Sequence, residues 1–349
     1  MLNFTSPGSN IFPVAVSSPD ALRWLLEPSD AGVRYLALRD LTDCSSKNLI
    51  SAASEGAHCA GPIAEVLRNM HPEGYWVKPG AGYSPKYTST IWSVILLAQL
   101  GASMESDKRI ATACDYLLDH CLSPDGRFTF NGQPAMTADC LQGNLSWSLV
   151  SLGCKDPRLD NAFEWMARSV TGEGVAPASE KTAGLRYTAS KCGPGFACGS
   201  NNKLPCAWGS VKVMLAFSIL PEDKKTRLIK DAITEGVNFL FSKDPARADY
   251  PCGYALEPSG NWWKFGFPVF YVSDILQNAE ALVNLGHGQD LRLANALELI
   301  RGKQDKMGRW QMEYDYTGKT WVDFGPKKQP NKWVTLRALR VLKKANQVS

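Results

Sequence analysis

A sequence repeat recurs along the chain and restricts the folds that the chain can adopt. Each copy contains a glycine-aromatic turn, an irregular polar stretch, an apolar helix ending near Leu-Gly, and an amphipathic helix. The clearest copy begins at Glu73–Trp76 and ends its apolar segment at Leu100–Gly101. The second begins at Asp125–Phe128 and ends at Leu152–Gly153. Repeats of this kind bury their apolar faces only by stacking on one another, so the pattern predicts a repetitive helical architecture.

The remaining copies bring the number of apolar helices to six. Their helices begin near Cys206–Trp208, Tyr271–Asp274, Lys332–Trp333 and, in a degenerate first copy, Asp30. Helices with one charged face follow most of them, at Lys108–His120, Asp156–Val170, Glu222–Phe241 and Asp290–Arg301. Helices that are apolar on nearly every side belong inside and one-sided helices outside. We therefore predict an all-α fold, an (α/α)6 toroid of two concentric helix rings forming a single domain over residues 1–349, with an open solenoid as the alternative.

Composition narrows the possible partners. The chain has 349 residues, 44% of them apolar, and its 38 basic against 34 acidic residues give a formal charge of +4 without a long basic block. We therefore expect no nucleic-acid partner. No stretch approaches the roughly 20 apolar residues of a membrane span, and Met1–Val14 lacks the pattern of an export signal. The expectation is a cytoplasmic protein without a membrane span, and the oligomeric state stays open.

The turn at Gln304–Trp310 resembles the Gln-Trp repeat of squalene and oxidosqualene cyclases, with Met307 where that motif usually has Asp. Glu73–Trp76 and Asp125–Phe128 resemble its second half. The resemblance extends from about Asp30 onward and implies the α/α toroid that these cyclases share with protein prenyltransferase β subunits. The chain is also similar to uncharacterised bacterial proteins that carry this repeat.

The resemblance implies a fold more than a reaction. The Asp-x-Asp-Asp motif of alkene-protonating cyclases is missing from the sequence, and so is the Asp-Asp-x-x-Asp signature of diphosphate-ionising terpene synthases. The prenyltransferase zinc set, Asp-x-Cys with a distant His, does not occur at its proper spacing either. Neither activity follows from the resemblance.

Aligning the apolar helices on their Leu-Gly ends places their first residues at one level. Tyr87 then corresponds to Asp139, and the next position of the second copy is Cys140. In a closed ring these positions converge on one opening, so we expect them to be neighbours. The other copies add Cys206, Trp208, Tyr271, Asp274, Lys332 and Trp333 to the same rim.

Carboxyl groups facing an apolar cavity suit acid-base catalysis, because desolvation raises a carboxyl pKa. Asp139 and Asp274 are the candidate acids or bases of this rim. The structural alternative is that both residues cap helices by accepting backbone N–H bonds.

Cysteines recur in the irregular segment 191–206, where Cys198 and Cys206 have two possible roles. With Cys140 and Asp139 they could ligate zinc, in a geometry resembling the prenyltransferase site. Alternatively, either thiol could act as a nucleophile or acid-base group with a pKa lowered at a helix N-terminus. Linalool dehydratase-isomerase, another α/α toroid, is similar in fold and in its use of cysteine. Buried inert thiols or a local disulfide are the structural alternatives.

Eleven tryptophans in this chain are many, and several fall on turns or apolar helices. Aromatic faces can stabilise a carbocation in a cavity, and they also pack ordinary repeat turns. The segment Trp262–Pro268, which includes Trp263, is aromatic enough to predict a wall or lid of the cavity.

These observations predict an enzyme with a central apolar cavity that acts on a small, largely apolar substrate, isoprenoid or aromatic. The chemistry would be that of a lyase, isomerase or cyclase, with Asp139, Cys140, Cys198, Cys206 and Asp274 as catalytic candidates. Substrate-binding candidates are Tyr87, Trp208, Trp263, Tyr271, Lys332 and Trp333. The alternatives are a zinc-dependent transferase or hydrolase and a non-catalytic lipid- or peptide-binding toroid, so the cofactor is either none or zinc.

Overall fold

Six helices with extensive buried surfaces form the centre of the protein. The computed structural model describes residues 19–347, so Met1–Val14 and both ends of the predicted domain lie outside the described residues. In the helix Thr90–Gln99, every residue from Thr90 to Ala98 is buried. The inner helices are α2 (Ala31–Leu41), α5 (Thr90–Gln99), α7 (Asp139–Ser151), α9 (Ala207–Ser218), α11 (Ile275–Asn284) and α13 (Lys332–Ala345).

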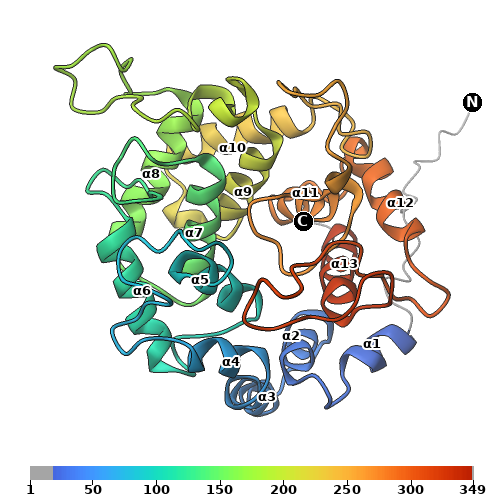
Figure 1. The fold of residues 1–349 in the computed structure, drawn as a ribbon. Helices are drawn as coiled ribbons and strands as arrows, with labels where there is room; N and C mark the ends of the chain where they lie inside the picture. The colour runs from blue at the N-terminus through green and yellow to red at the C-terminus, as the bar shows by residue number, and fades with distance from the viewer. Residues whose placement is uncertain (1–18, 348–349) are drawn as a thin grey trace, which may run out of the picture.

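The inner helices close into a ring (Figure 1). Helix α5 packs on α7, α7 on α9, α9 on α11, α11 on α13, and α13 on α2. The remaining gap is closed where α5 ends beside α2, because a Cβ atom on Gly101 would lie 2.5 Å from the Leu36 side chain. The fold is therefore an (α/α)6 toroid, and the open solenoid is excluded for the described residues.

Helices with one apolar face surround this ring (Figure 1). They are α1 (Pro19–Leu25), α3 (Lys47–Cys59), α4 (Pro62–Arg68), α6 (Lys108–Cys121), α8 (Arg158–Thr171), α10 (Arg227–Leu240) and α12 (Ala294–Gly302). Each outer helix packs on a neighbouring inner helix or, for α4, also on α3. The order of inner and outer helices follows the alternation of apolar and one-sided segments in the sequence.

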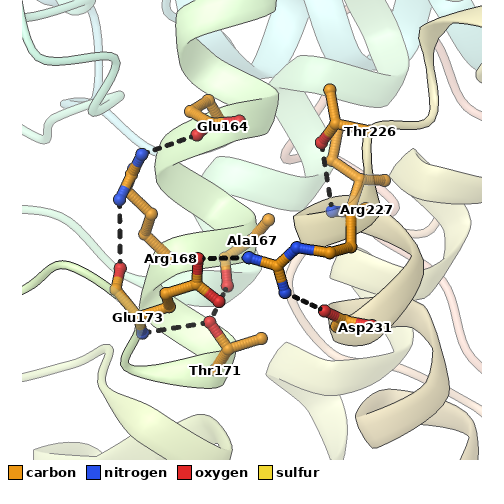
Figure 2. Close-up of polar contacts among 9 residues, drawn as sticks. Glu164, Ala167, Arg168, Thr171, Glu173, Thr226, Arg227 and Asp231 are labelled. Atoms are coloured by element: carbon orange, nitrogen blue, oxygen red, sulfur yellow. Dashed lines mark hydrogen bonds and ion pairs between the residues drawn. The ribbon is translucent and has the colours of Figure 1, made fainter.

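Polar contacts join neighbouring outer helices where they face solvent (Figure 2). The Arg227 guanidinium at the start of α10 donates to Glu173, just after α8, at 2.5 Å and to Asp231 at 2.6 Å. These side chains are half exposed, so each pair contributes little to stability. The buried faces of α8 and α10, which also pack on each other, carry the association.

Short elements occupy the loops. The strands β1 (Ala197–Cys198) and β2 (Leu204–Pro205) form an antiparallel pair. The 3-10 helices are η1 (Pro194–Phe196), η2 (Gly199–Asn201), η3 (Glu222–Lys224), η4 (Gly260–Trp263) and η5 (Leu291–Leu293).

The glycine-aromatic turns connect the two rings. The Trp76 backbone N–H donates to Thr90 on α5, and its indole N–H donates to the Val66 carbonyl on α4. Trp310 repeats the arrangement with Thr335 on α13 and a carbonyl of α12. Both indoles are fully buried. These two tryptophans therefore pack the repeat turns, which is the structural alternative given above. They line neither of the two cavities described below.

The Leu-Gly ends of the inner helices adopt the conformation expected of them. Gly101, Gly153 and Gly286 have φ values of 78°, 95° and 91°, in the left-handed region that a side chain disfavours. The turns then lead directly into the next outer segment. In the described part of the chain, no helix is long and apolar enough to cross a membrane.

Candidate functional site

A cavity of about 410 Å³ opens at the N-terminal ends of the inner helices. Trp92 and Ile95 from the first turns of α5, Leu141 and Asn144 from α7, and Trp208 from α9 form its inner wall. Loop residues complete the wall, and most of its surface is apolar. Its aromatic lining consists of Tyr83, Trp92, Phe130, Trp208, Tyr250, Tyr254, Trp262 and Tyr271.

Four cysteines line this cavity: Cys140 in the first turn of α7, Cys198 at the end of β1, Cys206 before α9, and Cys252 in a later loop. The β1–β2 pair brings two of them together, because the Cys206 N–H donates to the Phe196 carbonyl at 2.9 Å and reverses the chain. The expected convergence of thiols on one opening is therefore present in the structure.

Cys198 is the thiol most strongly activated by its surroundings. Hydrogen bonding with the Cys206 thiol, with the backbone N–H groups of Ser200 and Asn201 and with the Ser200 side chain lowers the pKa of this thiol. The Cys206 thiol is the largest cause of a pKa lowered to about 6, and burial opposes it. A thiolate is therefore the main form of Cys198 at neutral pH.

The neighbouring thiols stay protonated. Hydrogen bonding to Cys198 raises the pKa of Cys206 far above its ordinary value, and burial adds to the effect. Burial, with Asp139 and Cys198 nearby, raises the pKa of Cys140 to about 11. The cavity lining thus combines Cys198, whose pKa is lowered, with Cys140 and Cys206, whose pKa values are raised.

Asp139 lies behind this group and does not line the cavity. It is the first residue of α7, its exposed fraction is 4%, and its Oδ2 has no hydrogen-bond partner. A Cβ atom on Gly209 of α9 would lie 3.0 Å from the Asp139 Cβ, so the carboxyl group is enclosed between the two helices. Burial, reinforced by Cys198, raises its pKa well above the ordinary value. Burial thus favours the neutral form of the Asp139 carboxyl.

Asp274 occupies a different environment from the one expected for a cavity acid. Its Oδ1 caps α11 by accepting from the Gln277 N–H at 2.7 Å. Both of its oxygens also accept from the buried Arg337 guanidinium, at 2.8 and 2.9 Å. These contacts match the capping alternative and leave Asp274 outside the cavity wall.

The aromatic and basic rim candidates divide into two groups. Trp208 and Tyr271 line the cavity, whereas Tyr87 lies behind Tyr271, with their hydroxyls 3.5 Å apart. Trp263 donates to the Ala246 carbonyl outside the wall, and its neighbour Trp262 takes the lining position instead.

The two candidates at the start of α13 lie away from the opening. Lys332 pairs with Glu27 at 2.8 Å, and Trp333 stacks on Phe267 with ring centroids 4.6 Å apart. The loop Trp262–Pro268 and the segment before α13 fill that side of the ring, so these side chains face α1 and the loop.

The zinc hypothesis required Asp139, Cys140, Cys198 and Cys206 to act as one ligand set. No group of three or more His, Cys, Asp or Glu residues between 19 and 347 has an arrangement that could hold a metal ion. The unpartnered Asp139 oxygen is enclosed between α7 and α9 rather than aimed at the thiols' cavity. Among residues 19–347, Asp139, Cys140, Cys198 and Cys206 therefore do not form a ligand group of that kind.

Several lining residues had no signal in the repeat alignment. Lys86 lies 4.8 Å above the Tyr271 ring, and Lys191 lies 5.3 Å above that of Phe130. Tyr83, Tyr254 and Cys252 come from loops whose course depends on the closed ring. These residues lie in irregular segments, which the alignment of helix ends does not place.

No protein-family model matches the chain, and no curated protein matches it either. Among solved structures, it is similar to the glycoside hydrolase family 76 mannosidase Bt3792 of Bacteroides thetaiotaomicron VPI-5482, with a TM-score of 0.45 and 10% identity over 90% of this chain and 84% of that one. The type II terpene cyclase MstE of Scytonema has a TM-score of 0.31 and 12% identity, covering 84% of this chain and 97% of the cyclase.

A protein from Actinoplanes has a TM-score of 0.30 and 12% identity, covering 85% of this chain and 99% of that chain. At these identities and TM-scores no activity transfers from any of the three proteins.

Proposed function

We propose that the protein is an enzyme that performs thiol-assisted proton transfer, as an isomerase or lyase, on a small and largely apolar substrate. The observation that carries the proposal is the position of Cys198, which lines a largely apolar cavity together with Cys140 and Cys206. Hydrogen bonding with the Cys206 thiol is the main cause of its lowered pKa. A thiolate held in this way is both a base and a nucleophile.

The arrangement supports a double-bond shift without another reactant. The Cys198 thiolate would remove a proton from a substrate carbon beside an unsaturated group, and the resulting thiol would return a proton to a second carbon. One C–H bond breaks and one forms, the double bond moves, and the thiolate is restored. A general base is most effective when its pKa lies near the working pH, as a value of about 6 does.

The cavity wall supports an apolar substrate. An engineered apolar cavity of about 150 Å³ binds benzene, and this cavity of about 410 Å³ admits a molecule more than twice that size. Aromatic rings cover it on several sides, whereas Lys86 and Lys191 supply the positive charges of its lining. An isoprenoid or a substituted aromatic compound with one polar group fits this lining.

Alkylation by iodoacetamide, followed by peptide mass spectrometry, tests the proposal. We expect Cys198 to react first at pH 7, ahead of the exposed Cys59, and apolar ligands to protect it. Isoprenoid alcohols and alkenyl aromatics would be screened as protecting compounds. Each protecting compound would then be incubated with the wild type and Cys198→Ser, and the products analysed by gas chromatography.

Conversion by the wild type and loss of conversion in Cys198→Ser would support the enzyme. Cys59→Ser is the matched control, because Cys59 is exposed and lies on α3 away from the cavity. Slow alkylation of Cys198 together with protection by an unconverted ligand would favour the second candidate, a non-catalytic binding toroid. The mostly apolar lining of the cavity is the observation that favours this candidate.

A further inference from the structure

A second cavity, of about 110 Å³, lies toward the C-terminal ends of the inner helices. Ala98 and Gln99 at the end of α5, Ser151 at the end of α7, and the exposed Arg39 on α2 contribute to its lining. Ile95 and Asn144 line both cavities, so the two cavities adjoin at these residues. The second cavity therefore approaches solvent from the opposite end of the ring.

Cationic side chains from three inner helices surround this space: Lys212 on α9, Arg337 and Arg340 on α13, and Arg39 on α2. Glu280 on α11 is the acidic residue among the lining side chains. The cavity wall thus carries more positive than negative groups.

The arginines have carboxylate partners outside the cavity lining. Arg337 pairs with Asp274 at 2.8 Å, and Arg39 and Arg340 both pair with Asp40. Lys212 differs, because within residues 19–347 no carboxylate lies within ion-pair distance of its ammonium. Its hydrogen-bond partner is the neutral Gln277 side chain on α11.

Burial makes this lysine unusual. Lys212 is 1% exposed and sits where α7 and α9 approach so closely that a Cβ atom on Gly143 would lie 2.3 Å from the Lys212 backbone. Removing an ammonium group from water without a carboxylate in contact is costly, and the more distant Asp274 and Glu280 offset only part of that cost. An anion in the adjoining cavity would offset this cost and would also contact the arginine N–H groups.

We propose that the second cavity binds a small oxyanion, a carboxylate or a phosphate, between Lys212 and the α13 arginines. The cavity has room for a group of that size, and the planar arginine side chains suit oxyanion geometry. The proposal does not depend on the chemistry of the thiol-lined cavity, because Lys212, Arg337 and Arg340 line only the second cavity.

Isothermal titration of sodium acetate and sodium phosphate, at an ionic strength held constant with sodium chloride, tests this site. The wild type should bind at least one of the two oxyanions saturably, and the tighter one distinguishes a carboxylate site from a phosphate site. Lys212→Met and Arg340→Gln should each weaken binding about tenfold or more. Lys230→Met is the matched control, because Lys230 is an exposed lysine on the outer helix α10.

Absence of saturable binding of both anions in the wild type would overturn the proposal. Affinities equal to the wild type in both Lys212→Met and Arg340→Gln would also overturn it. If Lys212→Met does not fold, the wild type and Arg340→Gln decide the question, since Arg340 is partly exposed and tolerates substitution more readily.

Discussion

The two ends of the inner ring hold cavities of opposite character. At the N-terminal end of the helices, a large apolar cavity contains the thiols, with the unpartnered acid Asp139 behind them. Toward the C-terminal end, a smaller polar cavity contains the unpaired base Lys212. The comparison shows how the ring keeps an acid and a base apart: Asp139 lies at the start of α7, whereas Lys212 lies near the middle of the neighbouring helix α9.

Burial acts on these two residues in the same way. It raises the pKa of the Asp139 carboxyl and is the largest cause of lowering the pKa of Lys212 to about 7. Each residue is therefore shifted toward its neutral form. The consequences for stability against pH are opposite, and the following predictions test them.

The largest effect is expected at the Asp274–Arg337 pair, which lies beside the polar cavity. Asp274→Ala leaves the Arg337 charge buried without a partner and removes the cap of α11. We expect the free energy of unfolding to fall by about 3–5 kcal/mol, measured by urea denaturation. Asp231→Ala, which breaks an exposed pair with Arg227, should cost no more than about 1 kcal/mol. Equal losses in the two variants would contradict the structural role of Asp274.

Lys212→Met should increase stability. Because the Lys212 pKa is lowered in the folded state, its cost is fully present below about pH 7 and is relieved as pH rises toward the unfolded value of 10.5. The positive charge of Arg337 also lowers the Lys212 pKa, whereas Asp274, Cys140 and Glu280 raise it. Removing the amine should raise the free energy of unfolding by about 1–4 kcal/mol at pH 6, and by less at pH 10.

Urea denaturation at the two pH values, with Lys230→Met as control, checks the result for Lys212. A gain in stability that does not change between pH 6 and pH 10 would show that titration of the amine is not its source.

Asp139→Asn should show the opposite dependence on pH. The raised pKa favours the protonated form of Asp139 in the folded state, whereas the unfolded chain ionises above about pH 3.8, so the wild type loses stability as pH rises between the two pKa values. The asparagine variant does not titrate. It should match the wild type near pH 4 and exceed it by roughly 1–3 kcal/mol at pH 7.

Thermal denaturation across pH 4–7 measures the effect of Asp139→Asn. The exposed Asp249→Asn serves as the matched control. A larger gain at pH 4 than at pH 7 would reverse the assigned direction of the Asp139 shift.

The smallest effect is expected at the thiols. Wild-type Cys198 should alkylate faster as pH rises through about 6 and level off above pH 7, because its thiolate is then fully formed. Cys206→Ala removes the donor that is the main cause of the low pKa, so the inflection should move to higher pH. At pH 7 the rate should fall only about fivefold, since a thiolate of higher pKa is more nucleophilic.

Timed alkylation with mass spectrometry measures the Cys198 profile. Cys252→Ser, which alters another thiol of the same cavity, should leave it unchanged. An inflection near pH 6 in the Cys206→Ala variant would remove Cys206 as the cause.

The candidate site was only partly predictable. Aligning the starts of the inner helices predicted that Cys140, Cys206, Trp208 and Tyr271 share one rim. All four residues line the cavity. The same alignment could not show that α13 starts beside α1, which directs Lys332 toward Glu27. The sequence did mark Lys212, because it is the one charged residue in the apolar helix α9. The alignment of helix starts did not use this feature.

The sequence by itself determined the repeated helix pairs, because apolar periodicity, Leu-Gly ends and glycine-aromatic turns are local properties that repeat along the chain. Closure of these pairs into a ring was decided by the packing of α13 on α2 and of the α5 end on α2. Only the tertiary structure decided the ionisation of the site. The low pKa of Cys198 depends on where Cys206 lies across the β1–β2 turn, and the shifts of Asp139 and Lys212 depend on the close packing of α7 on α9. Electrostatic environment is set by distance and burial in space, and neither can be obtained from spacing along the chain.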